Sequence, residues 1–206
     1  MAHGHVHQGP RERTGAGLLA VDFANSVACP SCRVADALSS IEEFNRWIQA
    51  RPNLSISKAG RKDIGSLRQF RADIRVLLGA CVGRTSPPAS SLARVNSTRQ
   101  RATGRNDLMW HRGRWMVMER STRRSAADGI AGAVAQSVTD LLTSPGRATL
   151  RACRGPGCNH FILARTRQQI WCSPTGCGNR VRAARHYRRV MGRRSTPRRK
   201  TRHSRP

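Results

Sequence analysis

The sequence predicts a mainly α-helical chain, in which a helical N-terminal domain with a small β-hairpin precedes a small cysteine-organised module and a C-terminal basic helix. Three observations support this prediction. Apolar residues recur at three- and four-residue steps in several segments before residue 143. Four cysteines then form two pairs between residues 153 and 177. Finally, residues 151–206 hold 16 Arg or Lys and no Asp or Glu.

These changes in composition divide the chain into four parts. Residues 1–16 are rich in Gly, Arg and His without an apolar period, so they are expected to form a disordered tail. Residues 17–146 form the helical domain, and residues 147–192 form the cysteine module with its helix. Residues 193–206 are expected to be a disordered basic tail.

Helix signals and apolar stripes place the elements of the helical domain. Ser40 to Glu43 form a capping-box signature, and Pro52 ends the helix that follows. The apolar stretch 18–28 fits either a short helix or an extended segment. Gly113 separates two short runs rich in Met, Val and Trp within 108–119, which predicts a β-hairpin. Further helices are predicted over about 57–81, Ser91–Arg101 and Ala126–Leu142.

Two polar residues, Asp22 and Asn25, interrupt the apolar stretch 18–28. Because a buried polar group must be paired, the simpler interpretation is capping or a buried hydrogen bond. The functional alternative is a pocket for a small ligand.

Cys153, Cys158, Cys172 and Cys177 are candidate metal ligands. Each pair has four residues between its members, and Gly155 to Gly157 and Pro174 to Gly176 supply turn residues inside the loops. Two such loops can converge on one tetrahedral ion, and four thiolates suit Zn²⁺. The sequence therefore predicts one structural zinc in a four-cysteine zinc finger, with His160 outside the ligand set.

Cys29 and Cys32 form a separate Cys-x-x-Cys pair. This spacing suits a redox pair or half of a metal site. Cys81 is single and fits the buried stripe of a helix, so no further cysteine pair completes a second site. We expect a loop carrying two free thiols.

The net charge of +27 comes from 38 Arg and Lys residues against 11 Asp and Glu. A segment as basic as residues 151–206 is typical of polyanion binding. A helix is predicted from Asn179 to about Met191, with Ala183, Tyr187, Val190 and Met191 on a packing face. Arginine pairs with phosphates and can read guanine edges. The candidate nucleic-acid-binding residues are Arg165, Arg167, Arg180, Arg182, Arg185, Arg188, Arg189 and Arg193.

Two segments resemble known families. Trp171-Cys172-Ser173 and Cys177-Gly178-Asn179-Arg180, followed by the Arg-rich helix, resemble the CGNR zinc finger. Val21 to Ser26 resembles the Leu-Asp-Phe-x-Asn-Thr opening of the ABATE domain. That domain precedes CGNR fingers in bacterial proteins described as stress-induced transcription regulators. The resemblance implies an N-terminal domain that senses an unknown small-molecule effector or forms a homodimer.

Together these features predict a zinc-finger protein that binds nucleic acid, preferably DNA, and regulates transcription. The alternatives are an RNA- or ribosome-associated zinc protein, a thiol redox sensor that releases zinc, and an N-terminal domain that binds or converts a small molecule. Motifs for a phosphate-binding loop, a nucleophile elbow or a His-Glu metal site do not occur, so an enzyme is not expected. Neither an apolar signal region nor a membrane span is found, which predicts a cytoplasmic, nucleoid-associated protein without membrane partners.

Overall fold

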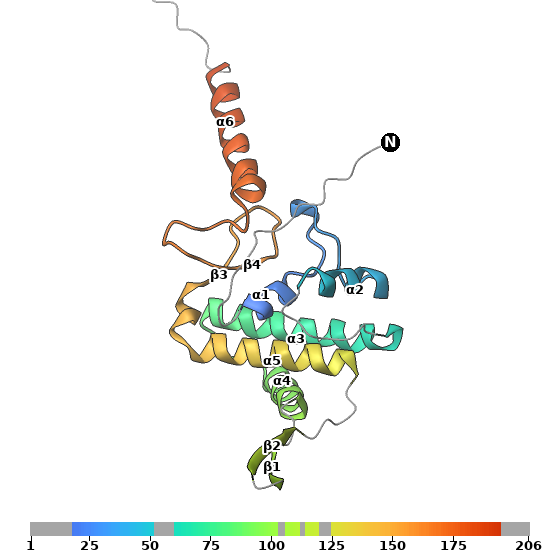
Figure 1. Cartoon of the computed structure of the whole chain (residues 1–206). Helices are drawn as coiled ribbons and strands as arrows, with labels where there is room; N and C mark the ends of the chain where they lie inside the picture. The colour runs from blue at the N-terminus through green and yellow to red at the C-terminus, as the bar shows by residue number, and fades with distance from the viewer. Residues whose placement is uncertain (1–17, 52–59, 103–105, 112–113, 120–124, 195–206) are drawn as a thin grey trace, which may run out of the picture.

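A computed structural model describes residues 18–51, 60–102, 106–111, 114–119 and 125–194 of the chain. The described part is mainly helical, as predicted, with two small antiparallel sheets (Figure 1). The long elements are α1 (Leu18–Ala24), α2 (Ile41–Gln49), α3 (Ile64–Gly83), α4 (Ala89–Ala102), β1 (Asn106–His111), β2 (Arg114–Glu119), α5 (Ala126–Thr143) and α6 (Asn179–Arg194). The 3₁₀ turns are η1 (Pro30–Cys32), η2 (Arg61–Asp63) and η3 (Pro145–Thr149). The finger adds β3 (Leu150–Ala152), β4 (Phe161–Leu163) and one helical turn, η4 (Pro174–Gly178).

The predicted helices of the N-terminal domain are confirmed, and capping explains where two of them begin. The hydroxyl of Ser40 accepts a hydrogen bond from Glu43 N at the start of α2. At the start of α5, Ser125 and Asp128 form a reciprocal capping box. The undecided stretch 18–28 begins with α1. The helix predicted over about 57–81 is α3, which begins at Ile64 and ends at Gly83; residues 52–59 lie outside the described chain.

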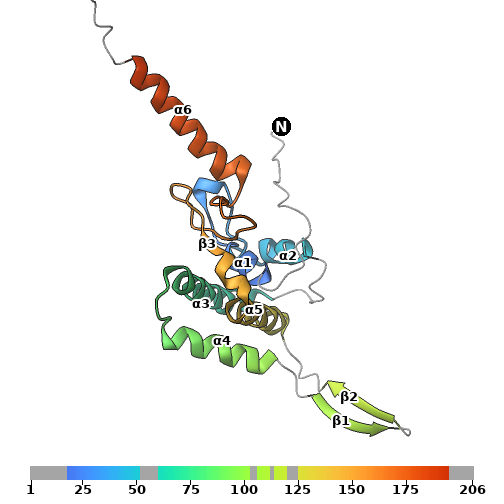
Figure 2. The same cartoon turned by 90° about the vertical axis from the view of Figure 1, so that its left-hand side faces the viewer.

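The core lies between α1, α3 and α5, which pack side by side, while α4 packs against α3 and α5 (Figures 1 and 2). Burial of the apolar stripes of these helices is the main source of stability. Cys81 packs at the edge of this core, as predicted. The largest fully buried side chains are Phe23, Leu38, Phe44, Leu67, Ile74, Leu78, Ile130, Val134, Val138 and Leu141.

Two buried charges fix α3 to its neighbours. Arg71 forms a two-pronged ion pair with Asp36, at 2.7 and 2.8 Å. Asp73 is 2% exposed and accepts hydrogen bonds from Ser91 and Arg94 of α4. Each buried charge is therefore paired, which burial in a medium of low dielectric requires.

The predicted hairpin is confirmed in β1 and β2, with Trp110 opposite Trp115 in the register. It lies at the opposite end of the molecule from α6 (Figures 1 and 2). The predicted tails, residues 1–16 and the part of the basic tail from 195 to 206, lie outside the described residues, as does Gly113 of the predicted turn. In the described part of the chain, no helix is both long and apolar enough to cross a membrane.

The finger abuts the helical domain directly. β3 and β4 pair antiparallel, with Leu150 opposite Leu163 and Ala152 opposite Phe161. β3 contacts α3, and β4 contacts α1. From this base, α6 projects away from the body of the protein (Figure 2). The prediction that one face of α6 packs is wrong, because Tyr187 is 61% exposed and Met191 is 40% exposed.

Candidate metal centre

The β3–β4 hairpin presents the first cysteine pair. Cys153 directly follows β3, and its N–H donates to the carbonyl of His160, which extends the ladder by one bond. Gly157 has φ of +67°, a left-handed conformation that glycine adopts without strain. Gly155 has no room for a side chain, because a Cβ there would lie 2.7 Å from Cys177 Sγ. The turn glycines therefore bring the two cysteine loops into contact.

The second pair is shaped by the turn before α6. Ser173 Oγ accepts a hydrogen bond from Gly176 N at 3.0 Å and begins η4. Cys177 is buried at the end of this turn, 3.6 Å from Cys172 between the two sulfurs. Helix α6 begins two residues later, so its first turn is fixed to the cysteine cluster.

Four sulfur atoms lie within 4.8 Å of one another, but they are not the predicted four. The set comprises Cys32, Cys158, Cys172 and Cys177. Cys32 Sγ lies 3.3 Å from Cys158 Sγ, 3.5 Å from Cys177 Sγ and 3.9 Å from Cys172 Sγ. Cys158 Sγ lies 3.8 Å from Cys172 Sγ.

These distances fit a metal ion. With Zn–S bonds of about 2.3 Å, a tetrahedral site places its sulfurs about 3.8 Å apart. The cluster lies between three short segments, namely η1, the loop between β3 and β4, and η4. The finger therefore holds one structural zinc, as the sequence predicts.

Cys153 lies at the edge of the cluster and has the surroundings of a thiolate ligand. It is 7% exposed, and its sulfur accepts hydrogen bonds from Gly155 N at 3.4 Å and Cys172 N at 3.2 Å. These two N–H···S bonds hold the Cys153 side chain in place beside the cluster. We therefore keep Cys153, Cys158, Cys172 and Cys177 as the proposed ligands of the finger's zinc.

The raised pKa values of the clustered thiols also favour a bound cation at this site. Burial raises the pKa of Cys158, and the neighbouring thiols of Cys32 and Cys153 raise it further. Burial and the thiol of Cys177 raise the pKa of Cys172 in the same way. A bound dication reverses this preference, because it stabilises the thiolates that crowding disfavours.

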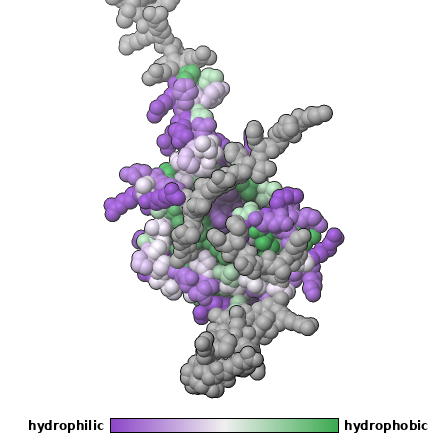
Figure 3. Space-filling view, in the orientation of Figure 1, coloured by the Kyte–Doolittle hydropathy of each residue, from purple (hydrophilic) through white to green (hydrophobic). Residues whose placement is uncertain are grey.

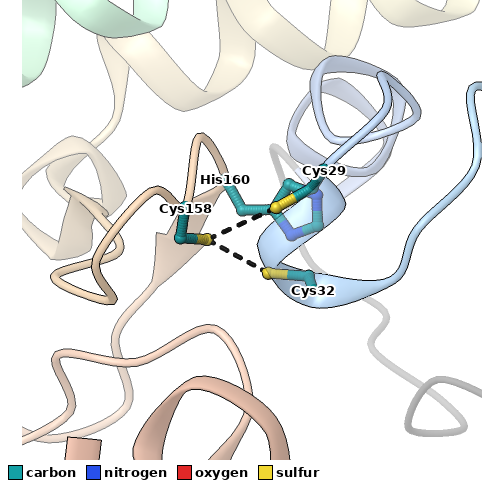
Figure 4. A group of neighbouring side chains, drawn as sticks. All are labelled: Cys29, Cys32, Cys158 and His160. Carbon is teal, nitrogen blue, oxygen red and sulfur yellow. Dashed lines mark hydrogen bonds between the residues drawn. The ribbon is translucent and has the colours of Figure 1, made fainter. Parts of the chain in front are cut away.

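The Cys29–Cys32 loop contacts this cluster, and its sequence pattern does not predict that contact. Its two thiols are not joined by a disulfide in this structure. However, both point toward Cys158 rather than away from the finger (Figure 4). His160 lies beside them, within 4.8 Å of the three sulfurs. The Cys-x-x-Cys spacing is the sequence feature that marks this pair as a candidate metal or redox pair. Sequence patterns do not predict its contact with Cys158, because the two lie 126 residues apart in the chain.

Asp22 and Asn25 have different partners in the structure. The Asp22 side chain is 55% exposed and faces Arg51, with 3.5 Å between the charged atoms. Asn25 forms side-chain hydrogen bonds in a partly buried site, in line with the simpler interpretation that its polar side chain is paired. Its Nδ2 donates to Phe161 O, and its Oδ1 accepts from Phe161 N, both at 2.8 Å.

The predicted nucleic-acid-binding arginines fall into two groups. Arg180 donates to Cys177 Sγ at 3.3 Å, and Arg182 donates to Pro174 O at 2.9 Å, so both guanidinium groups contact the finger. The others with described side chains are exposed, namely Arg165, Arg167, Arg185, Arg188 and Arg189. Figure 3 shows mostly hydrophilic surface along the described part of α6. Arg193 belongs to α6, but its side chain lies outside the described part.

Comparison with known proteins agrees with this architecture. Residues 17–145 match the ABATE family, described as "putative stress-induced transcription regulator". Residues 149–190 match the CGNR zinc finger. No curated protein matches the chain. Since the first match covers more than half of the sequence and the second follows it directly, the chain belongs to the ABATE family and carries a C-terminal CGNR zinc finger.

Proposed function

We propose that this protein is a DNA-binding transcription regulator without enzymatic activity, in which α6 and the zinc finger form the DNA-binding surface. The observation that carries the proposal is the exposed row of guanidinium groups on α6. Arg185, Arg188 and Arg189 are exposed, and among the described residues none of them forms an ion pair. The local excess of positive charge is thus available to a polyanion.

The geometry of α6 supports a groove-binding role. A helix of 16 residues is about 24 Å long, and the major groove of duplex DNA is wide enough to admit a helix. The bonds of Arg180 and Arg182 fix the first turns to the zinc cluster. Because the helix is held at one end by the metal centre, its exposed arginines have a defined geometry.

The helical domain offers a place for an effector. A cavity of about 310 Å³ lies between α3, α4 and α5. Its lining includes Phe70, Asp73, Arg94 and Thr98. The Asp73–Arg94 ion pair and Thr98 give this cavity a polar side, which suits a small polar ligand. We assign the sensing role to this domain for that reason.

The proposal is tested by measuring binding to duplex DNA and to folded RNA of equal length at a fixed salt concentration. We expect selection from random duplexes to yield a preferred sequence, and duplex DNA to bind more tightly than RNA. Replacing Arg185 by Ala should lower affinity about 5- to 150-fold if it contacts a base, and should relax specificity at one position. Removing residues 195–206 should instead weaken all sequences alike and flatten the salt dependence.

Arg61→Ala provides the matched control, because Arg61 is an exposed arginine on the helical domain. It should bind as the unmodified protein does. If Arg185→Ala and the tail deletion lower affinity equally for all duplexes, α6 does not read sequence. Tighter binding to RNA would favour the ribosome- or RNA-associated function.

The position of Cys29 and Cys32 favours thiol redox sensing as a second candidate. Burial raises the pKa of Cys29, but hydrogen bonds from Cys32, Ser31 and the backbone outweigh it and lower the pKa to about 7. A peroxide could oxidise two neighbouring thiols to a disulfide, with release of two water molecules and of zinc. Zinc release at low peroxide concentrations, reversed by a dithiol, would support this function. Retention of zinc would exclude it.

A further inference from the structure

We propose that the chain binds a second Zn²⁺ between the helical domain and the finger, held by Cys29, Cys32, Cys158 and His160. This inference does not depend on the proposed DNA-binding function. It concerns a site with ligands from both parts of the chain, with Cys158 as the ligand that it shares with the finger's zinc.

The four donor atoms form a compact group. They lie within 4.8 Å of one another. Cys158 Sγ is 3.9 Å from Cys29 Sγ and 3.3 Å from Cys32 Sγ. The thiols of Cys29 and Cys32, on the N-terminal loop, point toward Cys158 of the finger, and the His160 ring lies beside them (Figure 4). Three thiolates and one imidazole form a ligand set that closes a tetrahedral zinc site.

His160 supplies the second, independent observation. The residue is only 9% exposed, and its Nε2 is buried without a hydrogen-bond partner among the described residues. A buried nitrogen without a hydrogen-bond partner is unfavourable unless something binds it. A neutral imidazole nitrogen carries a lone pair that can bind a metal ion. A bound ion would satisfy this nitrogen.

The loop around Cys29 has the form of a metal knuckle. The 3₁₀ turn η1 begins directly after Cys29 and ends at Cys32, and Cys29 pairs with Val34 in an isolated antiparallel bridge. Arg33 closes the turn with φ of 56°, a left-handed conformation that a non-glycine residue rarely adopts. Such a conformation persists only where the surrounding structure stabilises it. The turn holds Cys29 and Cys32 on one side, as a bidentate metal loop requires.

This knuckle is docked on the finger by polar contacts. Ser31 Oγ donates to Gly157 O at 2.9 Å, and Asn159 Nδ2 donates to Ala28 O at 2.9 Å. Cys29 itself is fully buried. The loop is therefore held against the finger by specific hydrogen bonds and by the burial of Cys29.

The charges of a two-ion cluster can be compensated locally. Six thiolates and two Zn²⁺ ions leave a formal charge of −2. Arg75 reaches the N-terminal side of the cluster, where it donates to Ala24 O and Asn159 O. Arg180 donates to Cys177 Sγ on the other side. One guanidinium on each side thus balances the cluster.

The test is the metal content of the purified full-length chain, measured by native mass spectrometry and elemental analysis. We expect two zinc ions in the unmodified protein. Cys29→Ser and His160→Gln should each retain one ion, held by the finger. Cys172→Ser should also retain one ion, held by the interdomain site. Cys81→Ser, which removes a thiol outside the cluster, should retain both.

A cobalt-substituted protein gives a second readout. Two Co²⁺ ions that share the sulfur of Cys158 should couple magnetically and give a weakened paramagnetic signal. Cys29→Ser should restore the full signal of one isolated ion. A metal content of one ion in the folded, unmodified chain would overturn the proposal. The helical circular dichroism signal verifies that each variant is folded. Cys172→Ser serves as the reference for a protein that has lost only the finger's zinc.

Discussion

The side-chain amide of Asn25 satisfies both backbone polar groups of Phe161. The two bonds, each 2.8 Å long, join the end of α1 to strand β4 of the finger, 136 residues later in the chain. An amide side chain can mimic a neighbouring strand in this way because it carries one donor and one acceptor in a plane. The first apolar segment and the finger are therefore coupled structurally.

Replacing Asn25 by Ala should lower the free energy of unfolding by about 1–3 kcal/mol, because Phe161 N and O lose their partners in a partly buried site. Urea unfolding of the zinc-loaded protein measures this change. Gln168→Ala removes an exposed amide from the finger and should be nearly neutral. Equal stability of both variants would show that the Asn25 pair does not couple the two parts.

Replacing Gly155 by Ala should weaken zinc binding. The added Cβ would lie 2.7 Å from Cys177 Sγ and 2.9 Å from Cys177 Cβ, so one cysteine loop must move. Overpacking of this kind costs about 1–3 kcal/mol, equivalent to a loss of affinity of about 5- to 150-fold. Competition with a chromophoric chelator measures it.

Gly79→Ala is the control for this substitution, because a Cβ at Gly79 meets nothing within 4 Å and favours the helix. It should leave zinc affinity unchanged and slightly raise stability. Unchanged affinity in Gly155→Ala would mean that the two loops do not close as tightly as the structure indicates.

Replacing Asp36 by Asn should destabilise the helical domain in a pH-dependent way. Burial raises the pKa of Asp36, but hydrogen bonds from Arg71 and Leu38 N outweigh it and hold the pKa below its usual value. A carboxyl with a depressed pKa in the folded state stabilises the fold fully above about pH 4, and this contribution is lost as the pH falls through the folded value.

The difference between Asp36→Asn and the unmodified protein should therefore be about 3 kcal/mol at pH 7, since Arg71 loses its ionic partner, and should shrink toward pH 3. Urea unfolding across this pH range measures it, and zinc loss at low pH affects both proteins alike. Asp140→Asn, on the exposed side of α5, should show a smaller change. A difference that does not vary with pH would contradict the assigned ion pair.

Removing zinc should unfold the finger and leave the helical core intact. The finger has few buried apolar side chains, so it cannot fold without its metal. After chelation, hydrogen exchange should show lost protection in β3 and β4 and retained protection in α5. Added zinc should restore the original pattern. Equal loss in α5 would show that the two parts unfold as one cooperative unit.

Local sequence patterns were enough to predict the helices, the hairpin, the cysteine knuckles and the basic helix. These features depend on local patterns, such as the capping box at Ser40 and the apolar steps of α5. In contrast, the neighbours of Cys29, Cys32 and His160 and the partner of Asn25 depend on how the chain folds in three dimensions. No periodicity encodes contacts across more than 120 residues; the packing of β4 against α1 and of β3 against α3 creates them. The same packing leaves α6 without a surface to cover its apolar stripe, which local pattern alone assigned to the interior.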